Sequence, residues 1–187
     1  AREGLGTGNI GSLSIMLTGN ESGALDGVLG LTASTCDRSA LRDADLIVCN
    51  NTSTEADHLI LAVEIQEAVR QGARLVVASS VLDQADLMLS EVAMDPMRGR
   101  SSILWSGVIG RLLEDGVFDR SDARSLDGGD QLLASVISDT AQASSLSGVD
   151  EEKIVRTAGL LAESSRVVVV HSPDRMQDQS PGDMEML

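Results

Sequence analysis

The sequence predicts an α/β fold, in which a doubly wound, mostly parallel sheet has flanking helices. The first observation behind this prediction is a strand–helix–strand pattern. Short apolar runs at 46–49 and 75–78 enclose a helical stretch that stops at Gly72. The second observation is a strand-like run at 166–171, which contains four consecutive valines and follows a series of helical stretches. Strands buried on both faces of a parallel sheet have continuous apolar runs of this kind. Residues 45–79 are therefore expected to form one βαβ unit with a right-handed crossover.

The composition divides the chain into three parts. Residues 1–40 are too rich in glycine for one regular helix, and we interpret them as a partial segment of a preceding domain. Residues 41–172 carry the strand and helix patterns and are expected to form a Rossmann-like α/β domain. Residues 173–187 have the composition of a polar C-terminal tail. Because the sequence begins at Ala1 with no signal-type segment, we expect an excised part of a larger protein.

The first helix of the predicted domain has both a start signal and an apolar face. Thr52 and Glu55 have the T-x-x-E spacing of a capping box. One face of the helix that they open carries Leu61, Ile65, Ala68 and Val69. A helix with one apolar face packs that face on the core, so we expect these side chains to cover the sheet.

Apolar spacing and capping residues predict the remaining elements. In order, they are a short strand at 86–89, a loop at 95–100, a helix at 103–113 that ends near Gly116, a polar and Gly-rich stretch at 121–130, a helix at 131–143, a helix from Asp150 to about Ser164 and the last strand at 166–171. Trp105 and Phe118 are the single Trp and the single Phe of the chain, and both are expected in the core.

The charge of the chain excludes several classes of partner. The 29 acidic residues outnumber the 14 basic ones and give a formal net charge of −15. A phosphate backbone or an anionic membrane surface repels such a chain, so no nucleic acid partner is expected. The apolar runs are far shorter than the roughly 20 residues that span a bilayer, so we expect no direct membrane insertion. We interpret the chain as cytoplasmic.

Several candidate residues occur in patterns typical of structural residues rather than of catalytic, metal-binding or nucleotide-binding residues. Cys36 and Cys49 have no metal-ligand spacing, and we expect both to be reduced and buried. The carboxylates Asp83 and Asp86 have no nucleophile or base beside them and are expected on a solvated surface. The G-x-G-x-G pattern at 4–8 follows no strand, so we interpret it as a loop rather than as a nucleotide-binding motif.

The candidate ligand site is the segment that follows the first strand. In an open α/β sheet, ligands bind beyond the carboxyl ends of the strands, where loops lead into helices. Amide, hydroxyl and carboxyl groups follow this strand at Asn50, Asn51, Thr52, Ser53 and Glu55. Together with the N–H groups of a helix N-terminus, such groups can hold a phosphate. The alternative is that they only cap their own helix.

Two histidines are placed near the same edge of the predicted sheet. His58 falls in the first turn of the predicted helix, and His171 ends the last strand. Each is a candidate for the crevice beyond the sheet, and the alternative for each is a packed or solvated structural residue.

A family resemblance extends over most of the chain. The matching pieces are Leu5-Gly6-Thr7-Gly8-Asn9-Ile10, Gly19, Leu25, Gly30, Ala33, Thr35, Ala44-Asp45-Leu46, 111–119, 148–154, Ala158 and 161–163. In their order and spacing they resemble formate dehydrogenase alpha chains and other molybdopterin oxidoreductases. The resemblance implies an α/β fold of the formate dehydrogenase/DMSO reductase domain 2–3 type. It also implies that active relatives hold two pterin guanine dinucleotides around molybdenum or tungsten.

The functional positions of that family are changed in this chain. Leu17 and Thr18 stand where catalytic members carry the Cys, selenocysteine or Ser that ligates the metal, followed by His. A leucine side chain cannot ligate a metal. The family's G-x-N-P-x-x-x-H-P loop falls on residues 51–59, where only His58 remains. The family's D-P-R falls on the Ser-Ser-Val that begins at Ser79, which removes a carboxylate and a cation. The resemblance therefore implies degenerate pterin-dinucleotide positions.

A cofactor-free branch of the same family matches this pattern best. The sequence is similar in character to the G subunit of NADH:quinone oxidoreductase, complex I. That resemblance implies a structural role beside iron–sulfur clusters bound by a separate N-terminal part, with no cofactor in this fragment. The expected partners are other domains of the same chain and other subunits of a redox complex.

Two alternatives remain open at this point. One is a segment of an active formate-dehydrogenase-like molybdenum or tungsten enzyme, which predicts that a guanine nucleotide binds near Asn51 and Ser79. The other is the middle domain of a thiamine-diphosphate enzyme, which has a similar α/β body.

Overall fold

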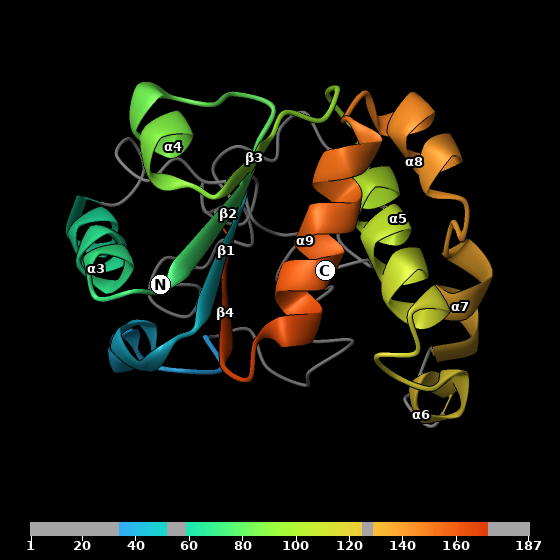
Figure 1. Cartoon of the computed structure of the whole chain (residues 1–187), viewed down its shortest axis with the longest axis horizontal. Helices are drawn as coiled ribbons and strands as arrows, with labels where there is room; N and C mark the ends of the chain where they lie inside the picture. Colours follow the sequence, from blue (N-terminus) through green and yellow to red (C-terminus); the bar gives the residue numbers. More distant parts are fainter. Residues whose placement is uncertain (1–33, 52–58, 125–128, 172–187) are drawn as a thin grey trace, which may run out of the picture.

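The computed structural model describes residues 34–51, 59–124 and 129–171, and in these ranges the fold is α/β. Its centre is a four-stranded parallel sheet (Figure 1). The strands are β1 (Leu46–Asn50), β2 (Arg74–Ala78), β3 (Val92–Met94) and β4 (Val167–His171), in the spatial order β3-β2-β1-β4. Helices lie on both sides of the sheet, so the predicted doubly wound α/β fold is confirmed.

The two central strands are buried on both faces because nearly all of their residues are apolar. Every residue of β1 is buried, and four of the five residues of β2 are buried. Successive side chains of a strand point to opposite faces. Leu46 and Val48 accordingly pack in one apolar cluster, and Ile47 and Cys49 pack in the other.

On one face, the sheet is covered by η1 (Arg38–Asp43), α3 (Leu59–Arg70) and α4 (Gln84–Leu89). Ile65 and Ala68 of α3 are buried against the sheet, and Leu61 and Val69 pack beside them, as the predicted apolar face requires. The predicted capping box of Thr52 and Glu55 lies outside the described residues.

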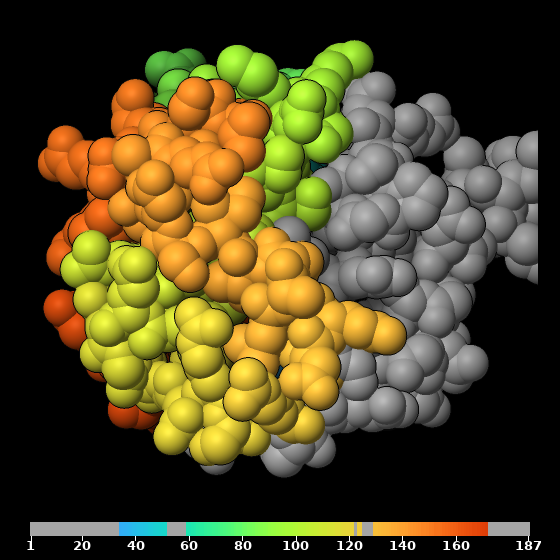
Figure 2. All heavy atoms as spheres, turned by 90° about the vertical axis from the view of Figure 1, so that its right-hand side faces the viewer, coloured from blue at the N-terminus to red at the C-terminus, as the bar shows by residue number. Residues whose placement is uncertain are grey.

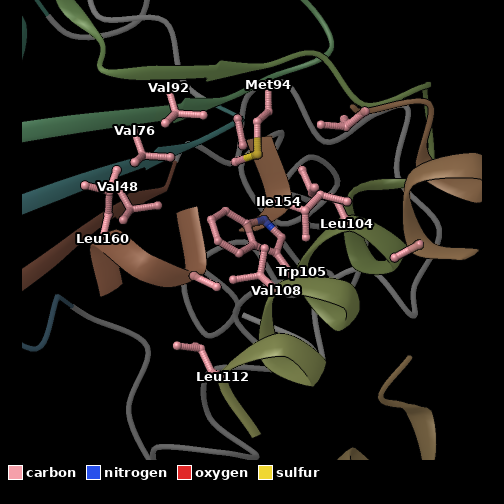
Figure 3. Packing of buried hydrophobic residues seen from close by; sticks show 14 of the residues in the cluster. Val48, Val76, Val92, Met94, Leu104, Trp105, Val108, Leu112, Ile154 and Leu160 are labelled. Atoms are coloured by element: carbon pink, nitrogen blue, oxygen red, sulfur yellow. The ribbon is translucent and has the colours of Figure 1, made fainter. Parts of the chain in front are cut away.

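The other face carries α5 (Ser101–Glu114), α6 (Arg120–Arg124), α7 (Gly129–Ser135), α8 (Thr140–Ser147) and α9 (Glu151–Glu163). Figure 2 looks onto this side, where α6 to α9 contribute much of the surface that the described residues form. Leu104 and Val108 of α5 and Ile154 of α9 meet Val48 and Val76 of the sheet (Figure 3). Trp105 is buried in this cluster and Phe118 packs against it, so the predicted core positions of both aromatic residues are confirmed.

The prediction of a strand at 86–89 is wrong, because this segment belongs to the short helix α4. The reason is a capping box that the apolar pattern does not reveal. The Asp83 carboxylate accepts a hydrogen bond from the Asp86 N–H, and the Asp86 carboxylate accepts one from the Asp83 N–H. The third strand follows at Val92–Met94. Asp86 is fully buried as a result, which corrects its predicted solvated position.

The single helix predicted at 131–143 is two helices, α7 and α8, with a break at 136–139. Two sets of hydrogen bonds define the break. The Ser106 hydroxyl donates to the Ser135 carbonyl and accepts from the Ile137 N–H. The Asp139 side chain then caps α8 by accepting from the Ala141 N–H. The stretch at 121–130, predicted only as polar and Gly-rich, contains most of α6 and the first residues of α7.

The cysteine prediction holds for one residue and fails for the other. Cys49 is buried in β1, whereas Cys36 is exposed near the start of the described residues. Burial, together with the nearby Asp86, raises the pKa of the Cys49 thiol to about 12, so this thiol remains protonated and unreactive at neutral pH. Among the described residues, no helix is both long enough and apolar enough to cross a bilayer.

Candidate ligand site at the switch point of the sheet

The order of the strands reverses between β1 and β4. The chain passes from β1 to β2 to β3 on one side, and then returns to place β4 on the other side of β1. Ligands of doubly wound sheets bind beyond the carboxyl ends of the strands at such a switch point. β1 ends at Asn50 and β4 ends at His171, and these two residues are direct partners in the ladder. The structure therefore brings two of the predicted site residues together.

Asn50 is fully buried and its side chain is held by α5. The Asn50 Oδ1 accepts a hydrogen bond of 2.9 Å from the Trp105 indole N–H and lies 3.5 Å from the Ser101 hydroxyl. An indole N–H only donates, so the oxygen of the Asn50 amide must face it. Both partners come from the first two turns of α5, and they fix the start of this helix against the end of β1.

His171 completes this cluster from β4. Its Nδ1 lies 3.2 Å from the Asn50 Nδ2 and 3.2 Å from the Asn50 main-chain oxygen. Burial lowers the pKa of His171, and the hydrogen bond to the Asn50 carbonyl opposes this effect only in part. The imidazole is therefore neutral at pH 7, in contact with a buried amide.

This lowered pKa predicts a pH dependence of stability. The unfolded chain, in which the histidine keeps its usual pKa of 6.5, binds a proton more readily than the folded chain. The contribution of His171 to the free energy of unfolding should therefore be fully present above pH 6.5. It should be lost as the pH falls from 6.5 to the pKa that His171 has in the folded chain.

The check is urea denaturation at several pH values for the wild type and for His171→Gln. The second histidine, His58, is present in both proteins, so its contribution cancels in the comparison. We expect the free energy of unfolding of the variant to depend less steeply on pH than that of the wild type, between pH 7.5 and the pKa of His171 in the folded chain. Identical slopes for the two proteins would contradict the lowered pKa of His171.

Asn51 begins the turn out of β1. Its φ of 53° lies in the left-handed region, which asparagine adopts more readily than most residues. The Asn51 N–H donates to the Ala78 carbonyl at 2.8 Å, so the turn is anchored to the end of β2. The side chain is 5% exposed, and its Nδ2 has no hydrogen-bond acceptor within reach among the described residues. A buried amide without a partner costs about 1–3 kcal/mol, so a hydrogen bond from this group to an acceptor on a ligand would be stabilising.

Ser79 directly follows β2, and its hydroxyl is used within its own turn. Its hydroxyl donates to the Val81 carbonyl at 2.9 Å and accepts from the Val81 N–H at 3.2 Å. Its N–H donates to the Met94 carbonyl of β3. Ser79 is 1% exposed, and both its hydroxyl and its N–H form hydrogen bonds within the protein.

The other predicted site residues, Thr52, Ser53, Glu55, His58 and Leu17, lie outside the described residues. In the parts that the structure describes, no three or more His, Cys, Asp or Glu side chains gather as they would around a metal ion. A depression of about 360 Å³ lies at the far end of α5, near Phe118 and Arg120, and is separate from the switch point.

Sequence reasoning missed the contribution of Trp105 and Ser101 to this cluster. The large aromatic side chain of Trp105 predicts a core position but names no polar partner. A buried indole N–H almost always finds an acceptor, and this rule was the available signal that a polar residue had to lie nearby. The rule does not say which residue, because Asn50 and Trp105 are 55 positions apart.

Comparisons with known proteins support a molybdopterin-oxidoreductase-like fold. No family model matches the chain. The curated protein "Probable oxidoreductase YjgC" of Bacillus subtilis (strain 168) is 23% identical over 170 residues, which are 89% of this chain and 17% of that protein. Acetylene hydratase from Pelobacter acetylenicus has a similar structure, with a TM-score of 0.77 and 17% identity. The match covers 97% of this chain and 25% of acetylene hydratase, so the chain spans a minor part of both proteins.

Proposed function

We propose that this chain forms a cofactor-free structural body within a larger oxidoreductase subunit, of the type found in the G subunit of NADH:quinone oxidoreductase. In this role the body packs beside a separate part that binds the iron–sulfur clusters, on the cytoplasmic side of the complex. Electrons pass through the clusters, and this body contributes shape and stability.

The observation that carries the proposal is that polar groups of Asn50 and Ser79 at the switch point already form hydrogen bonds within the protein. The Asn50 amide oxygen accepts from Trp105, the Asn50 main-chain oxygen lies 3.2 Å from His171 Nδ1, and the Ser79 hydroxyl is bound within its own turn. In a working dinucleotide site these groups would face the ligand. The loss of the family's Asp and Arg at the Ser-Ser-Val beginning at Ser79 agrees with this, since both a carboxylate acceptor and a cation are missing there. We infer that these residues do not fit a pterin guanine dinucleotide.

The exposed apolar side chains of α3 and α4 support a position inside a larger assembly. Leu59 and Ile60 of α3 are 73% and 66% exposed, and Met88 of α4 is 76% exposed. Val63 and Leu87, on the same two helices, are also more than half exposed. Large apolar side chains that gather on one layer mark a surface that other parts of a protein cover. The expected partners are other domains of the same polypeptide and other subunits of the redox complex.

One observation favours a second candidate, a segment of an active formate-dehydrogenase-like enzyme. The Asn51 Nδ2 is buried and has no acceptor among the residues that the structure describes, so it can still donate a hydrogen bond to a nucleotide. On this alternative, molybdopterin guanine dinucleotide would bind at the switch point as it does in active relatives.

A calorimetric titration separates the two functions. The purified chain is titrated with GDP and with molybdopterin guanine dinucleotide, and its molybdenum and tungsten contents are measured. The structural role predicts no heat of binding and no metal. Micromolar binding that weakens by about tenfold in Asn51→Ala, the loss of one hydrogen bond, would contradict it and favour the active enzyme.

A further inference from the structure

The orientation of the Asn50 amide follows from its contact with Trp105. An indole N–H can only donate a hydrogen bond, so the Asn50 Oδ1 must face it, at 2.9 Å. The Ser101 hydroxyl lies 3.5 Å from the same oxygen. The NH2 group of the amide is thereby turned toward β4, where the Asn50 Nδ2 lies 3.2 Å from the His171 Nδ1. Asn50 is fully buried, so this arrangement rests on contacts within the protein.

The two contacts of the His171 Nδ1 make opposite demands on its proton. The NH2 group of Asn50 can only donate, so the Nδ1 that faces it must accept, and the neutral imidazole then carries its hydrogen on Nε2. The Asn50 main-chain oxygen lies equally close to Nδ1, at 3.2 Å, and it favours a hydrogen on Nδ1 instead. Trp105 weights this choice, because it holds the NH2 group of the amide against His171.

Protonation of His171 reverses the requirement at Nδ1. Both nitrogens of an imidazolium donate, so a protonated Nδ1 meets a second donor, the NH2 group of Asn50. Half a turn of the amide would bring its oxygen to Nδ1, but it would also bring the NH2 group to the indole N–H of Trp105. One amide oxygen therefore lies between two donors, one from α5 and one from β4, and it cannot face both.

The groups that β1 and α5 present to this cluster are uncharged. They are Asn50, Ser101 and Trp105. The Cys49 thiol, on the opposite face of β1, stays protonated because burial raises its pKa to about 12. The charged residues at or before the starts of α5 and α9 are exposed, namely Arg98, Arg100, Glu151 and Glu152. Among the described residues, burial lowers the pKa of His171 and the Asn50 carbonyl opposes this effect.

We propose that Asn50, Trp105 and His171 form a proton-sensitive switch, in which a proton on the His171 Nδ1 and the hydrogen bond from Trp105 to Asn50 exclude each other. In the neutral state, Nδ1 accepts from the NH2 group of Asn50. In the protonated state, the amide turns its oxygen to His171 and releases the indole N–H of α5. The switch couples the end of β4 to the start of α5, and it goes beyond the proposed structural role and does not rest on it.

Nitrogen NMR at pH 7.5 tests the neutral state. In a His58→Gln background, His171 is the single histidine of the chain, so both of its ring nitrogens can be assigned. The ¹⁵N chemical shift distinguishes a ring nitrogen that carries hydrogen from one that does not, which coordinates alone leave to inference. We expect the hydrogen on Nε2. A hydrogen on Nδ1 would overturn the proposal, because Nδ1 would then donate to the Asn50 main-chain oxygen, whatever Trp105 does.

Trp105→Phe in the same background tests the coupling. Phenylalanine cannot donate, so the Asn50 amide is free to turn its oxygen to a protonated His171. We expect the pKa of His171 to rise by about one unit, which is a tenfold higher proton affinity. Ser101→Ala is the matched control, because it removes the more distant neighbour of the same oxygen, and the pKa should change much less. An equal pKa of His171 with and without the indole would overturn the proposal.

The unaltered cluster gives a further measurement that needs no Trp105 variant. As the pH falls, the indole ¹H signal of Trp105 should shift with the same midpoint as the ring signals of His171. An indole signal that stays in place while His171 titrates would also overturn the proposal. These measurements involve no ligand, so their outcome is independent of the titration that tests the proposed function.

Discussion

Replacing Trp105 by alanine is expected to lower the free energy of unfolding by about 3–5 kcal/mol, which is the usual cost of removing a large buried aromatic side chain. Trp105 is 7% exposed and lies in the cluster that joins α5 and α9 to the sheet. The substitution also removes the donor that the fully buried Asn50 Oδ1 needs. The measurement is urea denaturation followed by far-ultraviolet circular dichroism, because the single tryptophan is lost as a fluorescent probe.

A matched variant separates packing from the hydrogen bond. Trp105→Phe keeps an aromatic ring in the cluster but leaves the Asn50 Oδ1 with only the Ser101 hydroxyl, 3.5 Å away. We expect a loss of about 1–3 kcal/mol, the cost of a buried polar atom without a good partner. If Trp105→Phe is as stable as the wild type, the hydrogen bond to Asn50 does not stabilise the fold, and the description of the switch point is wrong.

Replacing Gly110 by alanine is expected to be the most damaging small substitution on α5. A Cβ at this position would lie 2.1 Å from the main-chain oxygen of Ile137. Because that atom belongs to the backbone of the break between α7 and α8, it cannot move aside as a flexible side chain would. Overpacking of this kind costs about 1–3 kcal/mol or more, even though alanine favours a helix over glycine.

Gly159→Ala is the matched control, since it makes the same change in the middle of a helix. At Gly159 in α9, an added Cβ meets nothing within 4 Å. Alanine should there raise the free energy of unfolding by about 0.5–1 kcal/mol through helix propensity alone. Urea denaturation should therefore show a lower free energy of unfolding than the wild type for Gly110→Ala and a higher one for Gly159→Ala. A stabilising effect of Gly110→Ala would mean that α5 and residues 136–139 are not packed as closely as described.

Three of the four described strands, β1, β2 and β4, and the first helix were predictable because their signals are local. The apolar runs at 46–49, 75–78 and 166–171 and the spacing of Ile65 and Ala68 follow directly from the periodicity of a strand or a helix. The segment at 86–89 was mistaken for a strand because a short apolar run does not distinguish a strand from one helical turn. The capping box of Asp83 and Asp86 makes this segment a helix.

The candidate site was predictable in position but not in its contacts. Asn50 and His171 each end an apolar run, so the rule for open sheets places them at the same edge. That they touch depends on the strand order, which places β4 next to β1. That Trp105 binds Asn50 depends on how α5 packs on the sheet, a relation between residues 55 positions apart. No local pattern encodes such a relation, and so the inward orientation of the Asn50 amide could not be read from the sequence.

The indole N–H of Trp105 offers the most direct test of the proposed structural role. As the single tryptophan, it gives one indole signal in a ¹H–¹⁵N NMR spectrum, and it reports on the Asn50 amide at the switch point. Adding an excess of GDP, and then of molybdopterin guanine dinucleotide, should leave this signal unmoved if the chain is a cofactor-free body. A shift that saturates at micromolar ligand would show that the switch point still binds a nucleotide, and it would contradict the proposed function.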